Sequence, residues 1–176
     1  MKIQLLPVAL FSALLAAGCG KNNSVPGAAA AVIVPIAAAT PAAPSAAAAK
    51  SGARVIEITA NDQMKFSVAT IEAKAGEELK VVLTNAGTLP KEAMGHNWVL
   101  LKAGTDVAAF ATAGMTAKET DYISPALKDQ VIASIPVLGP KKSGDVTFKA
   151  PAAGEYPFIC SFPGHFMLMK GTLTVK

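Results

Sequence analysis

The pattern of apolar and polar positions changes near residue 53, where an Ala- and Pro-rich stretch gives way to short alternating segments. Residues 54–60 and 79–84 alternate apolar and polar side chains, which is typical of strands with one buried face. Residues 97–102 are more continuously apolar, as in a strand covered on both faces. Similar short segments follow at 131–135, 145–149, 155–160 and 171–175. This part of the chain is therefore predicted to be all-β.

Turns containing Gly or Asn separate many of these segments. They lie at 74–77, 85–87, 143–145 and 152–154. Short strands with regular turns between them indicate a β-sandwich, here of about eight strands. A stretch of about 125 residues is long enough to bury a single core without covalent staples. We therefore predict one domain over residues 53–176.

One segment of this domain has a helical pattern. Thr105 or Asp106 can cap a helix, and Val107, Phe110 and Ala111 then share one of its faces. The residues that follow, 115–128, have no clear period. We expect the two segments together to form one short helical flap over the sandwich.

The N-terminus has the features of an export signal. Lys2 precedes an apolar run at 3–17, which has the length of a signal-peptide core and is short for a membrane span. Small residues then precede Cys19, as in bacterial lipoprotein signals, although Ala16 stands where Leu is usual. We predict a lipoprotein-type signal peptide at 1–18 and lipidation of Cys19. The alternative is an ordinary cleavable signal that leaves Cys19 as a free thiol.

Residues 19–52 are predicted to be a lipid-anchored linker. The stretch is rich in Ala and carries Pro26, Pro35, Pro41 and Pro44. These prolines disfavour both a membrane-spanning helix and an Ala-rich soluble helix. A partly extended Ala/Pro linker of this length would have a coil dimension of roughly 30 Å. Such a tether would let the domain move away from a membrane surface.

Charge excludes one class of partner. The chain has 16 basic and 12 acidic residues, a net charge of +4. From residue 51 onward there are 13 basic and 12 acidic residues, so the domain carries only +1. No basic patch interleaved with aromatic residues occurs along the chain, so we expect no nucleic-acid binding.

Ligands for a soft metal are concentrated near the C-terminus. Cys160, His165 and Met169 fall within ten residues, between a predicted strand that ends at Cys160 and another that follows Met169. The chain has two histidines, and the other one, His96, directly precedes the apolar segment at 97–102. Two imidazoles, one thiolate and a weak axial thioether are the ligands of blue-copper electron-transfer sites. We predict one copper per chain, cycling between Cu(I) and Cu(II), and no disulfide.

Sequence motifs around these residues resemble a known family. Residues 95–100 read Gly-His-Asn-Trp-Val-Leu, and residues 160–173 contain Cys-x-Phe-Pro-Gly-His and then Leu-Met-Lys-Gly-Thr-Leu. Together with Asn-Asp-Gln-Met-Lys-Phe at 61–66, they resemble the azurin family of type 1 (blue) copper proteins over about residues 54–176. The predicted tether is similar to that of the azurin-like outer-membrane lipoproteins.

The resemblance implies a cupredoxin-like Greek-key fold and a defined set of copper ligands. The implied ligands are three equatorial side chains, one axial side chain and one axial carbonyl: His96, Cys160, His165, Met169 and Gly95. Backbone N–H groups of Asn97 and Phe162 would donate to the Cys160 sulfur and raise the reduction potential. The Asn97 side chain would tie the two ligand loops together.

The resemblance also implies single-electron transfer between redox partners, such as c-type cytochromes or respiratory enzymes. An apolar patch around His165 would dock them through Met64, Leu89, Met94, Phe162, Pro163 and Leu168. We expect an exported, periplasmic monomer anchored to a bacterial membrane, the outer membrane in particular. Azurins usually carry a disulfide near the start of the domain, which this chain lacks, so we expect a lower thermal stability than that of a disulfide-bearing relative.

Electron transfer has two rival interpretations. A periplasmic copper protein for storage or delivery could use the same ligands, but delivery requires a more exposed site than a cysteine at a strand end. An enzyme would need an open coordination position, and these donors fill the site. A nucleophilic Cys160 beside His165 would leave the placement of His96 and Met169 unexplained. We therefore expect no enzymatic activity.

Overall fold

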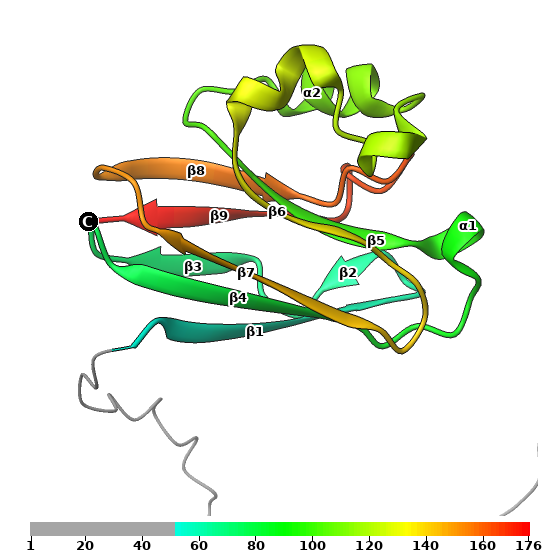
Figure 1. Ribbon diagram of the computed structural model, residues 1–176, viewed down its shortest axis with the longest axis horizontal. Helices are drawn as coiled ribbons and strands as arrows, with labels where there is room; N and C mark the ends of the chain where they lie inside the picture. Colours follow the sequence, from blue (N-terminus) through cyan, green and yellow to red (C-terminus); the bar gives the residue numbers. More distant parts are fainter. Residues whose placement is uncertain (1–51) are drawn as a thin grey trace, which may run out of the picture. The chain divides into compact units, whose positions relative to one another are not determined.

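The computed structural model describes residues 52–176, which form two β-sheets packed face to face (Figure 1). The predicted signal peptide, Cys19 and nearly all of the predicted linker lie outside the described residues. Within residues 52–176, no helix has the length and hydropathy that a membrane span requires.

The two sheets have the strand orders β2-β1-β4-β7 and β3-β9-β8-β5-β6. The strands are β1 (Arg54–Asn61), β2 (Lys65–Phe66), β3 (Thr70–Ala73), β4 (Glu78–Asn85), β5 (His96–Leu101), β6 (Val131–Leu138), β7 (Ser143–Lys149), β8 (Gly154–Ile159) and β9 (Lys170–Val175). β1 runs parallel to β4 and β3 runs parallel to β9, whereas the other pairs are antiparallel. The prediction of an all-β sandwich is confirmed.

Alternation along the strands builds the core between the sheets. Ile56 and Ile58 of β1 and Leu79 of β4 are buried, and the side chains between them are more exposed. They join Trp98 and Phe158 from the opposite sheet in one apolar cluster. Burying each large apolar side chain contributes about 1.5–3 kcal/mol, so this cluster is the main source of the domain's stability.

β5 is buried on both faces, which explains its nearly continuous apolar sequence. Trp98 and Leu100 belong to the core between the sheets. Val99 and Leu101 point to the other face and pack against Phe110 in a second cluster. The same strand therefore connects the sandwich core with the flap that covers the outer face of its sheet.

The flap (residues 105–130) consists of α2 (Val107–Gly114) and two 3-10 helices, η1 (Lys118–Thr120) and η2 (Pro125–Gln130). The Asp106 carboxylate accepts hydrogen bonds from the backbone N–H groups of Ala108 and Ala109, both at 3.0 Å, and so caps α2. Phe110 and Ala111 of α2 are buried on the face of the helix that packs against the sheet. The flap lies on the outer side of the sheet that contains β5 and β8 (Figure 1), as predicted.

Several short elements were not predicted from the sequence. β2 and β3 have two and four residues, too few for a period to be recognised. α1 (Lys91–Met94) is a single turn that starts after Pro90. Residues 52–176 therefore contain nine strands rather than the seven segments identified by alternation.

Candidate metal centre

Strand register brings the predicted copper ligands to one end of the sandwich. β5 and β8 are antiparallel, with Val99 opposite Ile159. His96 at the start of β5 and Cys160 directly after β8 therefore lie at the same end of the sheet. The backbone N–H of Cys160 donates to the carbonyl of Met169 at 3.0 Å, which sets these two residues opposite each other.

The loop that carries three of the donors (residues 160–169) is a compact series of turns. The His165 N–H donates to the Phe162 carbonyl at 3.0 Å, and the His165 carbonyl accepts from the N–H groups of Leu168 at 3.0 Å and Met169 at 2.8 Å. Gly164 has φ of 82°, a left-handed conformation that glycine adopts without steric cost. Backbone hydrogen bonds thus fix the loop.

The donor atoms of His96, Cys160 and His165 all lie within 4.8 Å of one another. Cys160 Sγ is 3.7 Å from His165 Nδ1, and the two imidazole rings have centroids 5.1 Å apart. His96, Cys160 and Met169 are fully buried, and His165 is 3% exposed. The structure therefore brings all four predicted side-chain ligands into one buried cluster.

Burial sets the protonation state of the cluster. It lowers the pKa of His96, against the smaller opposing effects of the Asn61 backbone and the Asp62 charge. It lowers the pKa of His165 to about 4, with the neighbouring His96 adding to the effect. Both imidazoles are therefore neutral at pH 7, which is the form that binds metals.

Burial also raises the pKa of Cys160 to about 12, although the backbone N–H groups of Asn97 and Phe162 act in the opposite direction. Without a cation, the sulfur is therefore a thiol. Both ring nitrogens of His96 are buried and have no hydrogen-bond partner among the described residues. Buried polar atoms without partners are rare in folded proteins. A bound metal ion would satisfy one of the two ring nitrogens, and the Asn61 backbone is near enough to the ring to affect its pKa. A thiolate, two neutral imidazoles and a thioether fit copper.

Gly95 precedes the first ligand and has no room for a side chain. A Cβ at this position would lie 2.6 Å from the Lys91 carbonyl oxygen and 2.5 Å from Val137 Cγ1. The same Cβ would lie 3.2 Å from an atom of the Phe162 ring. Gly95 therefore lets the backbone before His96 pass close to the loop that carries the other donors.

The Asn97 side chain connects the two ligand-bearing segments. Its Nδ2 donates to Ser161 Oγ at 2.8 Å, and its Oδ1 accepts from the Ser161 N–H at 2.8 Å. These bonds join the residue after His96 to the residue after Cys160. Ser161 was not singled out from the sequence, because a serine in a loop has no distinctive pattern.

The six predicted docking residues have different environments. Leu89 and Leu168 are well exposed, at 43% and 62%. Met64, Met94 and Pro163 are partly exposed. Phe162 is buried and packs against His165, with ring centroids 4.7 Å apart and an interplanar angle of 39°, so little of its surface is open to a partner.

Sequence reasoning missed Met167, which is 67% exposed beside Leu168. The neighbouring Phe166 instead packs into the cluster beneath α2. The two predicted ligands of this loop, His165 and Met169, are four residues apart, about one helical turn. This spacing places Met167, midway between them, on the opposite, outward side, and it is the signal that could have located Met167.

Comparison with known proteins agrees with this geometry. Residues 53–176 match the family described as copper binding proteins, plastocyanin/azurin family. The chain is 41% identical over 126 residues to an azurin of Pseudomonas chlororaphis, covering 69% of this chain and 97% of that protein. It is 42% identical over 130 residues to an azurin of Bordetella pertussis, covering 67% of this chain and 81% of that protein.

Solved structures of blue-copper proteins have the same fold. An azurin of Methylomonas sp. strain J is similar with a TM-score of 0.62 and 35% identity, over 71% of this chain and 99% of that chain. A reduced auracyanin from Roseiflexus castenholzii is similar with a TM-score of 0.62 and 32% identity, over the same shares of the two chains. The chain therefore belongs to the plastocyanin/azurin family of copper-binding proteins, and it is an electron carrier rather than an enzyme.

Proposed function

We propose that the domain transfers single electrons between redox proteins, with the edge of His165 as the point of entry and exit. Copper, when bound, supplies the one-electron couple. The chain's own residues hold the donors in fixed positions and exclude water from them. The observation that supports this proposal most strongly is the complete or nearly complete burial of the four donors, because a rigid, dry site needs little rearrangement when its charge changes.

In addition to the four side-chain ligands, we propose roles for three neighbouring groups. The Gly95 carbonyl would be a further ligand, and the lack of room for a Cβ at this position keeps the backbone before His96 close to the other donors. The backbone N–H groups of Asn97 and Phe162 would disperse charge on the Cys160 sulfur, in keeping with their opposition to its raised pKa. Both effects would tune the reduction potential.

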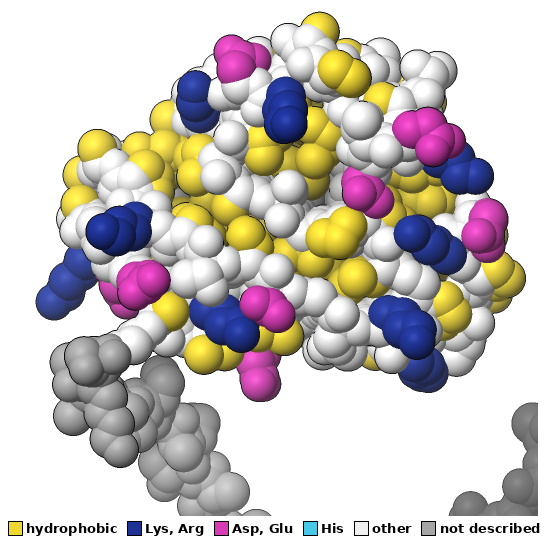
Figure 2. All heavy atoms as spheres, viewed as in Figure 1, with side chains coloured by type: hydrophobic (Ala, Val, Ile, Leu, Met, Phe, Trp, Pro, Cys, Tyr) yellow, Lys and Arg dark blue, Asp and Glu magenta, His cyan; other side chains and the backbone are white. Residues whose placement is uncertain are grey.

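Docking is proposed to occur through an apolar patch at this end of the domain. The docking patch consists of Met64, Leu89, Met94, Phe162, Pro163, Met167 and Leu168. Exposed apolar surface of this kind supports weak association with rapid release. Lys and Arg side chains are interspersed with Asp and Glu over the visible face of the domain (Figure 2), and its net charge is +1. We therefore expect weak electrostatic steering.

The cellular setting is also a proposal. A lipid on Cys19 and the linker at 19–52 would tether the copper domain to a bacterial membrane, the outer membrane in particular, on its periplasmic side. Suitable partners would be c-type cytochromes or respiratory enzymes, and the domain would act as a monomer. Pro136 on the edge strand β6 supports this last point, because proline discourages pairing between edge strands.

Storage or delivery of copper is less well supported. A delivery protein has to release its metal to an acceptor, which favours exposed ligands. Here Cys160, His96 and Met169 have no exposed surface. Rapid transfer of copper from the purified protein to a chelator or an acceptor protein would contradict the electron-carrier proposal.

Electron self-exchange with the Leu168→Glu variant tests the proposed docking patch. A charge at this exposed site should slow self-exchange by about tenfold, equivalent to ~1.4 kcal/mol, without changing the copper absorption spectrum. The matched control is Val55→Glu, which places the same charge on another exposed apolar residue (54%) in β1. Equal self-exchange rates for Leu168→Glu and Val55→Glu would contradict docking through this patch.

A further inference from the structure

Two consecutive residues of the flap, Asp121 and Tyr122, have left-handed backbone conformations, with φ of 53° and 60°. Such conformations are unfavourable for residues other than glycine and persist only where the surroundings enforce them. The Asp121 N–H donates to the Lys118 carbonyl at 3.2 Å, and the Tyr122 N–H donates to the Ala117 carbonyl at 2.9 Å. Asp121 and Tyr122 therefore form a strained but well-fixed turn.

The Asp121 carbonyl reaches the connection between the two ligand-bearing segments. It accepts a hydrogen bond from Asn97 Nδ2 at 2.9 Å and lies 3.3 Å from Ser161 Oγ, which also donates to it. These donors directly follow His96 and Cys160 in the chain. One carbonyl oxygen of the flap is thus bonded to the neighbours of two copper ligands.

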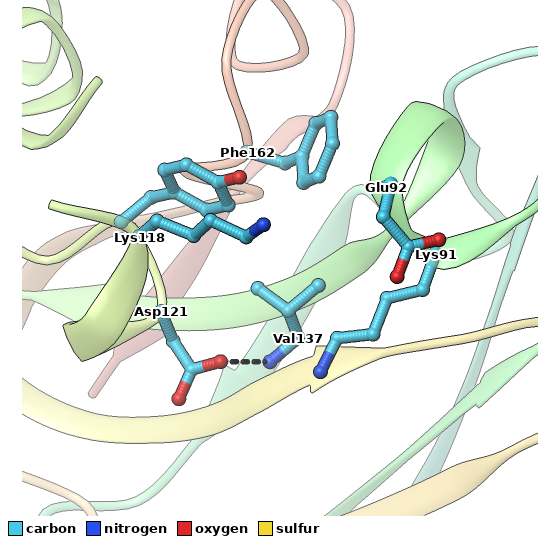
Figure 3. Close-up of a pocket in the computed structure, with 7 residues that line it drawn as sticks. Lys91, Glu92, Lys118, Asp121, Val137 and Phe162 are labelled. Carbon is cyan, nitrogen blue, oxygen red and sulfur yellow. Dashed lines mark hydrogen bonds between the residues drawn. The ribbon is translucent and has the colours of Figure 1, made fainter. Parts of the chain in front are cut away.

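The Asp121 carboxylate fixes a second contact of the metal centre. Its Oδ1 accepts from the Val137 N–H at 2.9 Å (Figure 3). The Val137 side chain is one of the groups that leave no room for a Cβ on Gly95, and the next residue, Leu138, pairs with His96. The carboxylate therefore holds β6 against the backbone that leads into the first ligand.

The Tyr122 ring supports the aromatic side chain beside the second histidine. It meets the Phe162 ring edge-on, with centroids 5.1 Å apart and an interplanar angle of 70°. Phe162 in turn packs against His165. A pocket of about 150 Å³, lined by Lys91, Lys118, Val137 and Phe162 among others, opens beside this contact (Figure 3). Tyr122 therefore supplies much of the restraint on Phe162 from this side.

We propose that Asp121 and Tyr122 are positioning residues of the copper centre. Their turn pins the segments after His96 and Cys160 to each other and supports Phe162 against His165. This role gives a reason for two strained residues in succession, since a relaxed turn would not present the carbonyl, the carboxylate and the ring to three different contacts. The proposal rests on the copper-binding role of the four donors.

Labelling of Cys160 in metal-free protein tests this positioning without relying on copper. The full chain is used with Cys19→Ser, so that Cys160 is the only thiol. Cys160 is buried, so an aromatic disulfide reagent reaches it only when the ligand loops separate. We expect Asp121→Ala and Tyr122→Ala to be labelled about tenfold faster, because the loss of a buried hydrogen bond or aromatic contact makes opening of the loops correspondingly more frequent.

The matched controls keep the proposed contacts. Asp121→Asn retains an acceptor oxygen and tolerates the left-handed conformation, and Tyr122→Phe retains the ring. Both should be labelled at the wild-type rate. If Asp121→Ala does not fold, Asp121→Gly replaces it, because glycine adopts this conformation freely but lacks the carboxylate. Wild-type labelling of Asp121→Gly and Tyr122→Ala would overturn the proposal.

Copper spectroscopy on the same variants separates this proposal from the proposed function. We expect the two alanine variants to show an altered thiolate-to-copper absorption band and about tenfold faster loss of copper to a chelator. Alanine variants that lose only thermal stability, with an unchanged band and unchanged copper loss, would reduce the turn to a structural element and overturn its positioning role. Absence of the band from copper-loaded wild-type protein would instead contradict ligation by Cys160 and, with it, the proposed function.

Discussion

At the scale of single residues, the properties of the metal centre depend on how burial shifts the pKa values of its ionisable side chains. Cys160 is a thiol in the metal-free protein, because burial raises its pKa to about 12. The two imidazoles are already neutral, because burial lowers the pKa of both. Copper binds the thiolate form of cysteine, so the metal has to displace the proton on Cys160. The histidines have no proton to release at pH 7.

Copper binding should therefore release about one proton per ion at pH 7. The raised pKa of Cys160 makes the apparent affinity increase by about tenfold per pH unit over the range below that pKa. Calorimetric titration of the metal-free protein with Cu(II), in buffers of different ionisation enthalpy, measures the number of protons released. Release of two protons would show that a histidine is protonated before binding, and release of none would show that Cys160 is not a ligand.

Residue types and spacing were sufficient to predict the donors but not their supports. Cys160, His165 and Met169 have distinctive chemistry and lie in one loop, and His96 was the remaining histidine. Asp121 contacts the centre partly through a backbone carbonyl, which any residue type could supply. Such contacts depend on tertiary packing, so no pattern in the sequence indicates them.

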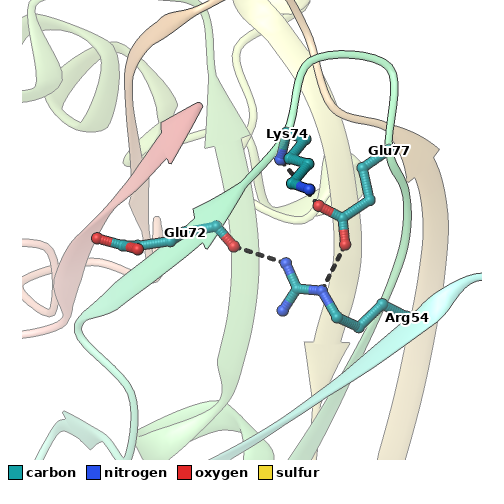
Figure 4. Close-up of polar contacts among 4 residues, drawn as sticks. All are labelled: Arg54, Glu72, Lys74 and Glu77. Carbon is teal, nitrogen blue, oxygen red and sulfur yellow. Dashed lines mark hydrogen bonds and ion pairs between the residues drawn. The ribbon is translucent and has the colours of Figure 1, made fainter. Parts of the chain in front are cut away.

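At the scale of secondary-structure elements, a polar cluster fixes the start of β1. Arg54, its first residue, donates from Nε to Glu77 Oε1 and from a guanidinium nitrogen to the Glu72 carbonyl, both at 2.6 Å (Figure 4). Glu77 Oε2 accepts from the Lys74 N–H at 2.8 Å. This cluster joins β1, β3 and the turn before β4. It fixes the start of the domain without a disulfide, since Cys160, the one cysteine among the residues that the structure describes, is free.

Replacing Glu77 with Gln should lower the free energy of unfolding by about 0.5–1 kcal/mol at pH 7, the upper range for partly exposed ion pairs. The bond from Arg54 lowers the pKa of Glu77 in the folded state. The stabilisation that this bond gives the folded state is therefore fully present above pH 4.5, the ordinary pKa of a glutamate. It is lost as the pH falls through the lowered pKa of Glu77. Urea unfolding at several pH values should show the difference at neutral pH and its disappearance in acid.

The matched control for Glu77 is Asp145→Asn, which removes a carboxylate from an exposed pair with Lys80 at 3.3 Å. This variant should be less destabilised, because the pair has no additional backbone bond. An equal loss in the two variants, or no loss in Glu77→Gln, would contradict the role of the polar cluster at β1.

Long elements with a clear period could be predicted, whereas short ones could not. β1 and β4 alternate over eight residues each, and Asp106 caps α2 as its sequence indicates. β3 consists of four residues and forms through parallel pairing with β9, a hundred residues away in the chain. Its formation depends on that long-range pairing rather than on local preference.

At the scale of the whole domain, the copper ligands and the start of β1 lie at opposite ends of the sandwich. The loop between β8 and β9 is at one end of the sandwich, and the C-terminus and the start of β1 are at the other (Figure 1). The start of β1 therefore lies away from the docking patch (Figure 1). This arrangement agrees with the proposed role of a tethered carrier that meets its partners through the copper end.

The reduction potential should be nearly independent of pH between about 6 and 8. Histidine is the side chain that ordinarily titrates in this range, and both histidines of the chain are assigned to copper. Protein-film voltammetry of the wild-type protein provides the measurement. A sigmoidal change in potential within this range would contradict the prediction and would indicate that one histidine leaves the copper.

Visible absorption of the full chain loaded with Cu(II), recorded for the wild type and for Cys160→Ser, tests whether Cys160 is a ligand in a blue-copper site. We expect an intense thiolate-to-copper band that colours the wild type blue and is absent from the variant, with metal content verified in both samples. A wild-type protein that contains copper but lacks this band, or a Cys160→Ser variant that retains it, would contradict the account.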